Sequence, residues 1–250
     1  CVNPDEAYVK VKNGDYTYYL AEALCETVLE GDYTVLERFK GKDLEYKEYE
    51  PLFDYAVQIC EKQKKKAFYV VCDPYVTLTD GTGVVHIAPA FGEDDSKVGR
   101  RYDLPFVQLV DARGEMTGET PWAGTFVKKA DPLVLKALDE KGLLFSAPNF
   151  EHSYPHCWRC KKPIIFRATP QWFCSVDSFK DAACAACDDV RWLPAWGIDR
   201  MKAMIRERAD WCISRPRRSG LPLPVFYCKD CGKPIYTDQT IANTTKTSGE

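Results

Sequence analysis

The sequence contains no long hydrophobic run. No segment of its 250 residues approaches the ~20 consecutive apolar residues of a membrane-spanning helix, so no such helix is predicted. Neither the Walker pattern nor GxGxxG occurs, so no phosphate-binding loop of those kinds is predicted. A strong charge is also lacking: the net charge of −3 gives no overall attraction to nucleic acid, and RNA contacts have to come from local basic patches.

The remaining composition is that of an ordinary soluble globular protein. Hydrophobic residues make up 45% and charged residues 28%, so disorder is not expected. The length suffices for one large or two ordinary domains with a substantial core. Because the sequence begins with Cys1 and not with methionine, we expect the natural amino terminus to lie upstream.

Cysteine is abundant, with twelve residues. An even number is compatible with disulfides, yet the chain is large and three pairs have CxxC spacing. This combination favours metal-binding thiols in a reducing compartment over a disulfide scaffold. The three pairs are Cys157/Cys160, Cys184/Cys187 and Cys228/Cys231.

The stretch Thr79–Asp95, with the sequence TDGTGVVHIAPAFGEDD, combines a glycine-rich turn, a short apolar run and a histidine. Its last three residues are acidic and are predicted to begin a helix, because carboxylates suit a first helical turn. Ligand-facing polar groups are often held in this way. From the residues alone a plainer interpretation stays open, in which a hairpin precedes a capped helix and His86 is a half-buried, hydrogen-bonded residue.

Three blocks of sequence resemble the editing domain and following region of isoleucyl-tRNA synthetases, a family of class I aminoacyl-tRNA synthetases. The first is the stretch just described. The second, His152–Phe173, has the sequence HSYPHCWRCKKPIIFRATPQWF, and the third, Trp192–Arg215, has the sequence WLPAWGIDRMKAMIRERADWCISR. Valyl and leucyl enzymes carry related editing domains, but the second block is more similar to the isoleucyl enzymes.

The resemblance implies an α/β fold in three parts. Residues 1–150 correspond to a large β-barrel-like editing domain, incomplete at its amino-terminal side, with mixed strands and peripheral helices. Residues 151–190 correspond to a zinc-knuckle connection. Residues 191–250 correspond to the start of the second half of a Rossmann-type catalytic domain. Periodicity alone predicts many short strands and a few helices over the first part, without showing that the strands close.

Several local elements are predicted from the residues themselves. Asn13-Gly14-Asp15 between alternating runs indicates a β-hairpin. Strands are expected over 67–72 and 106–110. Helices are expected to begin at Glu93 and to cover 131–141 and 198–210, where apolar residues recur at helical spacing.

The resemblance implies an editing pocket around the central stretch. Asp95 would hold the α-amino group of a mischarged amino acid, which suits the chemistry because a carboxylate gives charge-assisted hydrogen bonds to an ammonium group. Asp94 is the alternative, and helix capping is a structural role open to both. His86 would line the pocket and discriminate against the larger amino acid more than act as a base. Backbone groups of Gly81, Thr82 and Gly83 would form part of its wall.

One element of the family's pocket is absent from this sequence. A threonine-rich segment ending in a TTPWTLP-type sequence forms the second wall and would lie just before Cys1. Catalysis by this chain alone is therefore not expected.

The resemblance assigns zinc to two of the cysteine pairs. A CxxC turn presents two thiolates to one tetrahedral metal, so Cys157/Cys160 and Cys228/Cys231 are each half of a zinc site. In the family each pair meets another pair outside the corresponding segment, and we favour these two half-sites over one shared Cys₄ site. Cys184 and Cys187 are interpreted as small apolar helix residues, and Cys174 and Cys212 as core thiols.

The segment from Arg215 to Ser219 resembles the family's WCISRQRxWG block, which also includes Arg217 and Arg218. Pro216 replaces the usual glutamine and Ser219 the usual tryptophan, which puts the local geometry in doubt. The HIGH-type and KMSKS-type ATP motifs of class I synthetases are absent. ATP and magnesium are therefore expected for the whole enzyme only.

The function implied is that of part of a cytoplasmic, monomeric enzyme that joins isoleucine to tRNA(Ile) and hydrolyses mischarged valyl-tRNA in this segment. Two alternatives are a freestanding deacylase acting on mischarged tRNA and a zinc-dependent RNA-binding module without catalysis. No membrane partner is expected.

Overall fold

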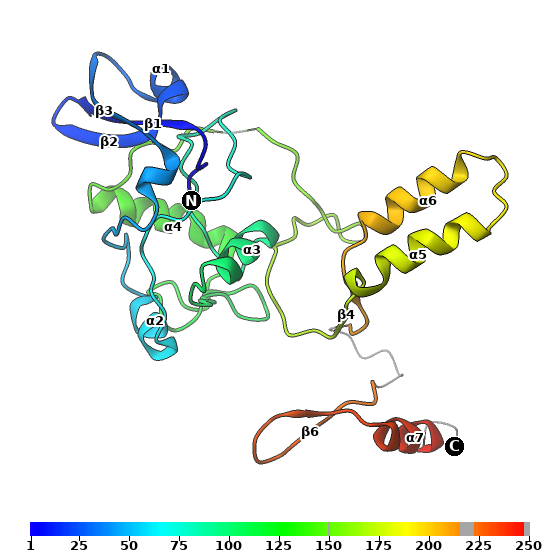
Figure 1. The fold of residues 1–250 in the computed structure, drawn as a ribbon. Coiled ribbons are helices and arrows are strands. Elements are labelled where there is room, and N and C mark those ends of the chain that lie inside the picture. The colour runs from blue at the N-terminus through cyan, green and yellow to red at the C-terminus, as the bar shows by residue number, and fades with distance from the viewer. Residues whose placement is uncertain (150, 216–222, 248–250) are drawn as a thin grey trace. The chain divides into compact units, whose positions relative to one another are not determined.

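The structure is a computed structural model that describes the chain except residues 150, 216–222 and 248–250 (Figure 1). It divides into two compact units, Cys1–Ala168 and Thr169–Glu250. Both contain helices and strands, so the mixed α/β content expected from the sequence is present. Among the described residues, no helix is both long and apolar enough to span a bilayer.

A three-stranded antiparallel sheet begins the first unit. β1 (Ala7–Asn13) lies between β2 (Tyr16–Ala21) and β3 (Tyr33–Lys40). Asn13 pairs with Tyr16, which leaves a two-residue hairpin loop in which Gly14 adopts a positive φ of 59°. The predicted hairpin is confirmed, and its glycine supplies the backbone conformation that such turns require.

β1 contributes buried side chains on both of its faces, although Lys12 is exposed. Val9 and Val11 pack with Leu20 and Cys25 beneath α1 (Cys25–Val28), while Tyr8 points into a second cluster that includes Val2 and Cys72. Figure 1 shows α1 beside the sheet. Because β1 is the middle strand of the sheet and contributes buried side chains to two core clusters, this part of the unit is built around it.

Three longer helices follow in the first unit: α2 (Val57–Gln63), α3 (Glu93–Arg101) and α4 (Val127–Glu140). α3 begins at Glu93, as its acidic first turn predicts. α4 begins four residues before the predicted Asp131 and carries Pro132 inside the helix, with Ala130 buried. In this extra amino-terminal turn only Ala130 is buried and both lysines are exposed, so the spacing of apolar residues placed the helix start too late.

The described residues do not form the closed barrel that the resemblance implies. Their only multi-residue ladders are the three-stranded sheet and two antiparallel pairs of two-residue strands. The strands expected over 67–72 and 106–110 make isolated bridges instead, such as those of Cys72 with Val2 and of Val110 with Met116. A barrel needs continuous ladders between neighbouring strands, and prolines such as Pro74 and Pro89 interrupt this region.

The second unit consists of short strand pairs and helices. β4 (Phe173–Cys174) pairs with β5 (Trp211–Cys212), and β6 (Phe226–Tyr227) pairs with β7 (Pro234–Ile235). In the sequence between β4 and β5 come two helices, α5 (Lys180–Ala186) and α6 (Gly197–Arg206). They lie side by side (Figure 1).

The described part of this unit contains no parallel sheet, because both strand pairs are antiparallel. The Rossmann-type sheet is therefore not seen in it. α7 covers Asp238–Thr247. Short 3₁₀ helices complete the two units: η1 (Glu22–Leu24), η2 (Gly41–Leu44), η3 (Asp177–Phe179) and η4 (Cys187–Asp189).

Candidate functional site

The glycine-rich turn is fastened to the central sheet. The Tyr8 hydroxyl donates a buried hydrogen bond of 2.6 Å to the Gly83 carbonyl, and the Ala21 N–H donates one of 3.0 Å to the Thr82 carbonyl. Gly83 has a φ of 71°, and a Cβ atom there would lie 2.6 Å from the Ala21 Cβ. Only glycine fits this position, because any side chain would meet both the strained backbone and the sheet.

Asp95 turns its carboxylate toward the loop that precedes α3. Its Oδ2 accepts a hydrogen bond of 3.1 Å from the Ala88 N–H, and its Oδ1 accepts one of 3.3 Å from the Tyr75 hydroxyl. Both contacts are partly buried. Each carboxylate oxygen thus has one protein donor and keeps acceptor capacity for a further donor.

Asp94 differs from its neighbour in every one of these respects. It is exposed, and its Oδ1 lies 3.2 Å from Lys97 Nζ on the next turn of the same helix. The roughly 100° between consecutive helical residues sends the two side chains in different directions. The structure therefore separates the two predicted candidates: Asp95 faces the loop and Asp94 faces solvent.

His86 lies on the loop that Asp95 faces. The protein lowers the pKa of His86, chiefly by keeping water from the ring, while Asp95 acts in the opposite direction. As a residue His86 remains solvent-exposed, so this desolvation is partial. A lowered pKa favours the neutral imidazole at neutral pH. The geometric link between the two predicted residues is the loop itself, since Asp95 accepts the hydrogen bond from Ala88, two residues after His86.

The first cysteine pair forms a tight turn. The Cys157 N–H donates to the Lys162 carbonyl at 2.8 Å, and the Lys161 N–H donates back to the Cys157 carbonyl at 2.8 Å. Lys161 has a positive φ of 57°. Hydrogen bonds from the backbone N–H groups of Cys160 and Arg159 lower the pKa of the Cys157 thiol.

The second pair repeats this backbone pattern. The Cys228 N–H donates to the Lys233 carbonyl at 2.9 Å, the Gly232 N–H donates to the Cys228 carbonyl at 2.9 Å, and Gly232 has a φ of 68°. The backbone N–H groups of Cys231 and Asp230 lower the pKa of the Cys228 thiol. Metals bind thiolates, so both turns fit the chemistry of a thiolate site.

No group of three or more histidine, cysteine or acidic side chains is arranged to hold a metal within the described ranges. Each turn supplies two sulfur ligands of the four in a tetrahedral zinc site. The zinc assignment therefore stays a prediction.

The other cysteines have structural surroundings. Cys184 and Cys187 are buried, and the Cys187 thiol donates to the Ala183 carbonyl one turn back, at 3.3 Å. This agrees with their interpretation as helix residues. Cys212 is partly buried, whereas Cys174 is exposed. The prediction of a core thiol is wrong for Cys174, because both residues of its short strand β4 are exposed.

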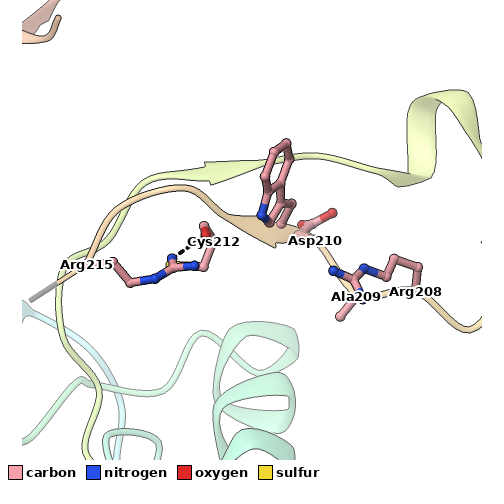
Figure 2. A pocket seen from close by; sticks show the side chains of 6 residues that line it. Arg208, Ala209, Asp210, Cys212 and Arg215 are labelled. Carbon is pink, nitrogen blue, oxygen red and sulfur yellow. Dashed lines mark hydrogen bonds between the residues drawn. The ribbon is translucent and has the colours of Figure 1, made fainter. Parts of the chain in front are cut away.

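A cavity that the sequence did not predict lies around β5 and has a volume of about 370 Å³ (Figure 2). Figure 2 shows the guanidinium group of Arg215 next to Cys212, whose carbonyl accepts a hydrogen bond of 2.6 Å from it. A neighbouring cavity of about 320 Å³ also includes Arg215. The first is lined by Arg208, Ala209, Asp210, Trp211, Cys212 and Arg215, and the second by Pro170, Gln171, Trp172, Ser214, Arg215 and Tyr227.

Neither cavity includes His86 or Asp95, so the predicted editing pocket stays a prediction. The only sequence signal for the first cavity was the WCISR string, which was noted for its resemblance and not for a pocket. Pro216, Arg217, Arg218 and Ser219 of the same block lie outside the described residues.

A comparison with protein families decides what kind of protein this is. Residues 11–250 match the family model described as tRNA synthetases class I (I, L, M and V). The chain belongs to this family. Its class I synthetase relatives include isoleucine–tRNA ligases from Thermoanaerobacter sp. (strain X514), 42% identical over 96% of this chain and 25% of the relative, and from Caldicellulosiruptor saccharolyticus, 43% identical over 98% and 26%. The isoleucine–tRNA ligase of Clostridium novyi (strain NT) is 45% identical over 92% of this chain and 22% of the relative.

The chain thus spans about a quarter of the length of the curated class I synthetases it matches. Two groups that contact Asp95 were not predicted from the sequence: the hydroxyl of Tyr75 and the backbone N–H of Ala88. Tyr75 lies 20 positions before Asp95, and no periodicity or motif spacing links the two.

Proposed function

We propose that this chain is part of an isoleucine–tRNA ligase and carries the site that hydrolyses mischarged valyl-tRNA. The family match and the identity to isoleucine–tRNA ligases support the parent enzyme. The fixed orientation of the Asp95 carboxylate is the observation that carries the editing role. A carboxylate with one donor on each oxygen is preorganised and can bind an ammonium group without rearrangement.

Editing is needed because the synthetic site alone cannot distinguish two similar amino acids well enough. Isoleucine and valine differ by one methylene group, which gives a synthetic pocket little discrimination, and isoleucyl-tRNA synthetases are the standard example of this limit. A second site that admits the smaller amino acid and hydrolyses its ester corrects the error.

The proposed chemistry relies on positioning. Asp95 holds the α-amino group of the valyl ester, and water attacks the ester carbonyl, which breaks the bond to the ribose oxygen. His86 borders the aminoacyl group and excludes the larger side chain. Its pKa direction allows a neutral ring, but no dedicated protein base is required if the ester is held in an attack geometry.

The whole protein is proposed to use ATP and magnesium, to bind tRNA(Ile), and to act as a cytoplasmic monomer. Residues 191–250 would begin the second half of the catalytic domain. The test is to assay the full-length protein for isoleucine-dependent ATP–pyrophosphate exchange and for hydrolysis of valyl-tRNA(Ile). Both activities are expected. Hydrolysis without exchange would indicate a freestanding deacylase, and RNA binding with neither activity a non-catalytic module.

We further propose that each CxxC turn contributes two thiolates to its own zinc ion, completed by ligands from outside this chain. Bound zinc would hold together chain segments that are distant in sequence. In the full-length protein, Cys157→Ser and Cys228→Ser should each lower the zinc content by one ion, and the double variant by two. Elemental analysis after dialysis measures this.

The matched control is Cys174→Ser, because Cys174 is exposed and belongs to no CxxC pair. Its zinc content should equal that of the parent protein. If each single variant and the double variant all lose the same one ion, the two pairs share a single Cys₄ site and the two-site proposal is wrong.

A further inference from the structure

The segment Asp73–Tyr75 lies against α3 and contacts both of its ends. Toward the carboxyl end, the Asp73 carboxylate forms an ion pair with Arg101. Asp73 also accepts a hydrogen bond of 2.8 Å from the Tyr75 N–H, which fixes the local turn. Toward the amino end, the Tyr75 hydroxyl reaches Asp95. The helix that carries Asp95 is therefore held at two points by one short segment.

The Tyr75 ring is held by packing. It lies against a buried cluster formed by Tyr69, Val71 and Val98, the last of which belongs to α3. A ring fixed between the segment and the helix leaves its hydroxyl little freedom to move. The hydroxyl position is thus set by the same packing that sets the position of α3.

The hydroxyl is also a constant donor. Burial, and secondly the negative charge of Asp95, raise the pKa of Tyr75, so the phenol keeps its proton at all physiological pH values. Hydrogen bonds from Tyr75 to Oδ1 and from Ala88 to Oδ2 fix the rotation of the carboxylate about its Cβ–Cγ bond. Without the hydroxyl, the Ala88 N–H would be the one remaining hydrogen-bond donor to this carboxylate among the described residues.

We propose that Tyr75 is a positioning residue for the editing reaction: its hydroxyl aims the Asp95 carboxylate at the α-amino group of the mischarged amino acid. This inference rests on the proposed function. Tyr75 itself need not touch the substrate. Its effect passes through Asp95, which makes the inference separable from a general role in stability.

The test is Tyr75→Phe in the full-length protein, because this change removes the hydroxyl and keeps the ring. Loss of a hydrogen bond to a charged acceptor should slow deacylation of valyl-tRNA(Ile) by roughly 10-fold. Most of the affinity for tRNA comes from contacts elsewhere, so the loss should fall on kcat while KM changes less than about 2-fold. Isoleucine activation should be unchanged.

A double variant separates positioning from stability. If Tyr75 acts only through Asp95, Tyr75→Phe/Asp95→Ala should deacylate as slowly as Asp95→Ala alone, within about 2-fold. Independent effects would instead multiply. Multiplied effects, or a Tyr75→Phe variant with the parent kcat, would overturn the inference.

Tyr69→Phe is the matched control. Tyr69 belongs to the same cluster, and its hydroxyl donates to the Tyr102 carbonyl at 3.1 Å, away from Asp95. Its deacylation rate should stay at the parent value, and an equal loss in both Phe variants would contradict a specific role for Tyr75. The proposed function fails separately, if Asp95→Ala itself deacylates normally.

Discussion

Asp95→Ala in the full-length protein should abolish most hydrolysis of valyl-tRNA(Ile) and leave isoleucine activation nearly intact. The substitution removes the carboxylate that binds the ammonium group, a charge-assisted interaction of about 1.5–3 kcal/mol, so the rate should fall roughly 10- to 150-fold. Loss of positioning enlarges this effect. Single-turnover deacylation measures the first activity and ATP–pyrophosphate exchange the second.

Asp94→Ala is the matched control for this experiment. The two residues are adjacent in α3, but Asp94 is exposed and pairs with Lys97, so its loss removes only a surface ion pair. Deacylation by this variant should stay close to the parent rate. An inactive Asp94→Ala protein beside a normal Asp95→Ala protein would mean that the functional carboxylate was assigned to the wrong neighbour.

Gly83→Ala should destabilise the central turn by about 2–4 kcal/mol. A non-glycine residue at a φ of 71° costs about 1 kcal/mol or more, and the new Cβ would lie 2.6 Å from the Ala21 Cβ and 3.0 Å from Leu78 Cδ2. Relieving this overlap has to move the turn away from the Tyr8 hydroxyl. Amide hydrogen exchange of the full-length protein should become faster over β2 and the turn.

Gly81→Ala provides the comparison, since Gly81 has nearly the same φ of 70° but nothing within 4 Å of its Cβ position. Gly81→Ala should destabilise its turn only by the cost of placing alanine at a positive φ, about 1 kcal/mol. Equal exchange rates in the two alanine variants would show that contact with the sheet contributes nothing at Gly83.

Local elements were predictable where a few adjacent residues decide the outcome. The turn at Gly14 and the acidic start of α3 at Glu93 depend on backbone freedom and on charge near a helix end, and both are confirmed. The start of α4 was predicted too late, because the burial of Ala130 is a tertiary effect that the spacing of the apolar residues after Asp131 does not reveal.

Long-range features were less accessible. The run of aromatic and β-branched residues over 67–72 suggested a strand, but a ladder requires a partner of matching register, and Cys72 and Tyr69 find only single bridges. The contact between Tyr75 and Asp95 has the same character, because it depends on how a loop passes α3. The sequence could propose Asp95 through resemblance, whereas its orienting partners required the three-dimensional arrangement.

The two CxxC turns have a consequence for how such turns are recognised and altered. They share one hydrogen-bond frame, yet the position after the second cysteine is Gly232 in one and Lys161 in the other, both at positive φ. A sequence pattern that requires glycine after the second cysteine would match the turn at Cys228 and miss the turn at Cys157. Lys161 adopts a left-handed backbone conformation that costs free energy for a residue with a Cβ atom and that glycine adopts freely. Lys161→Gly is therefore expected to stabilise this turn.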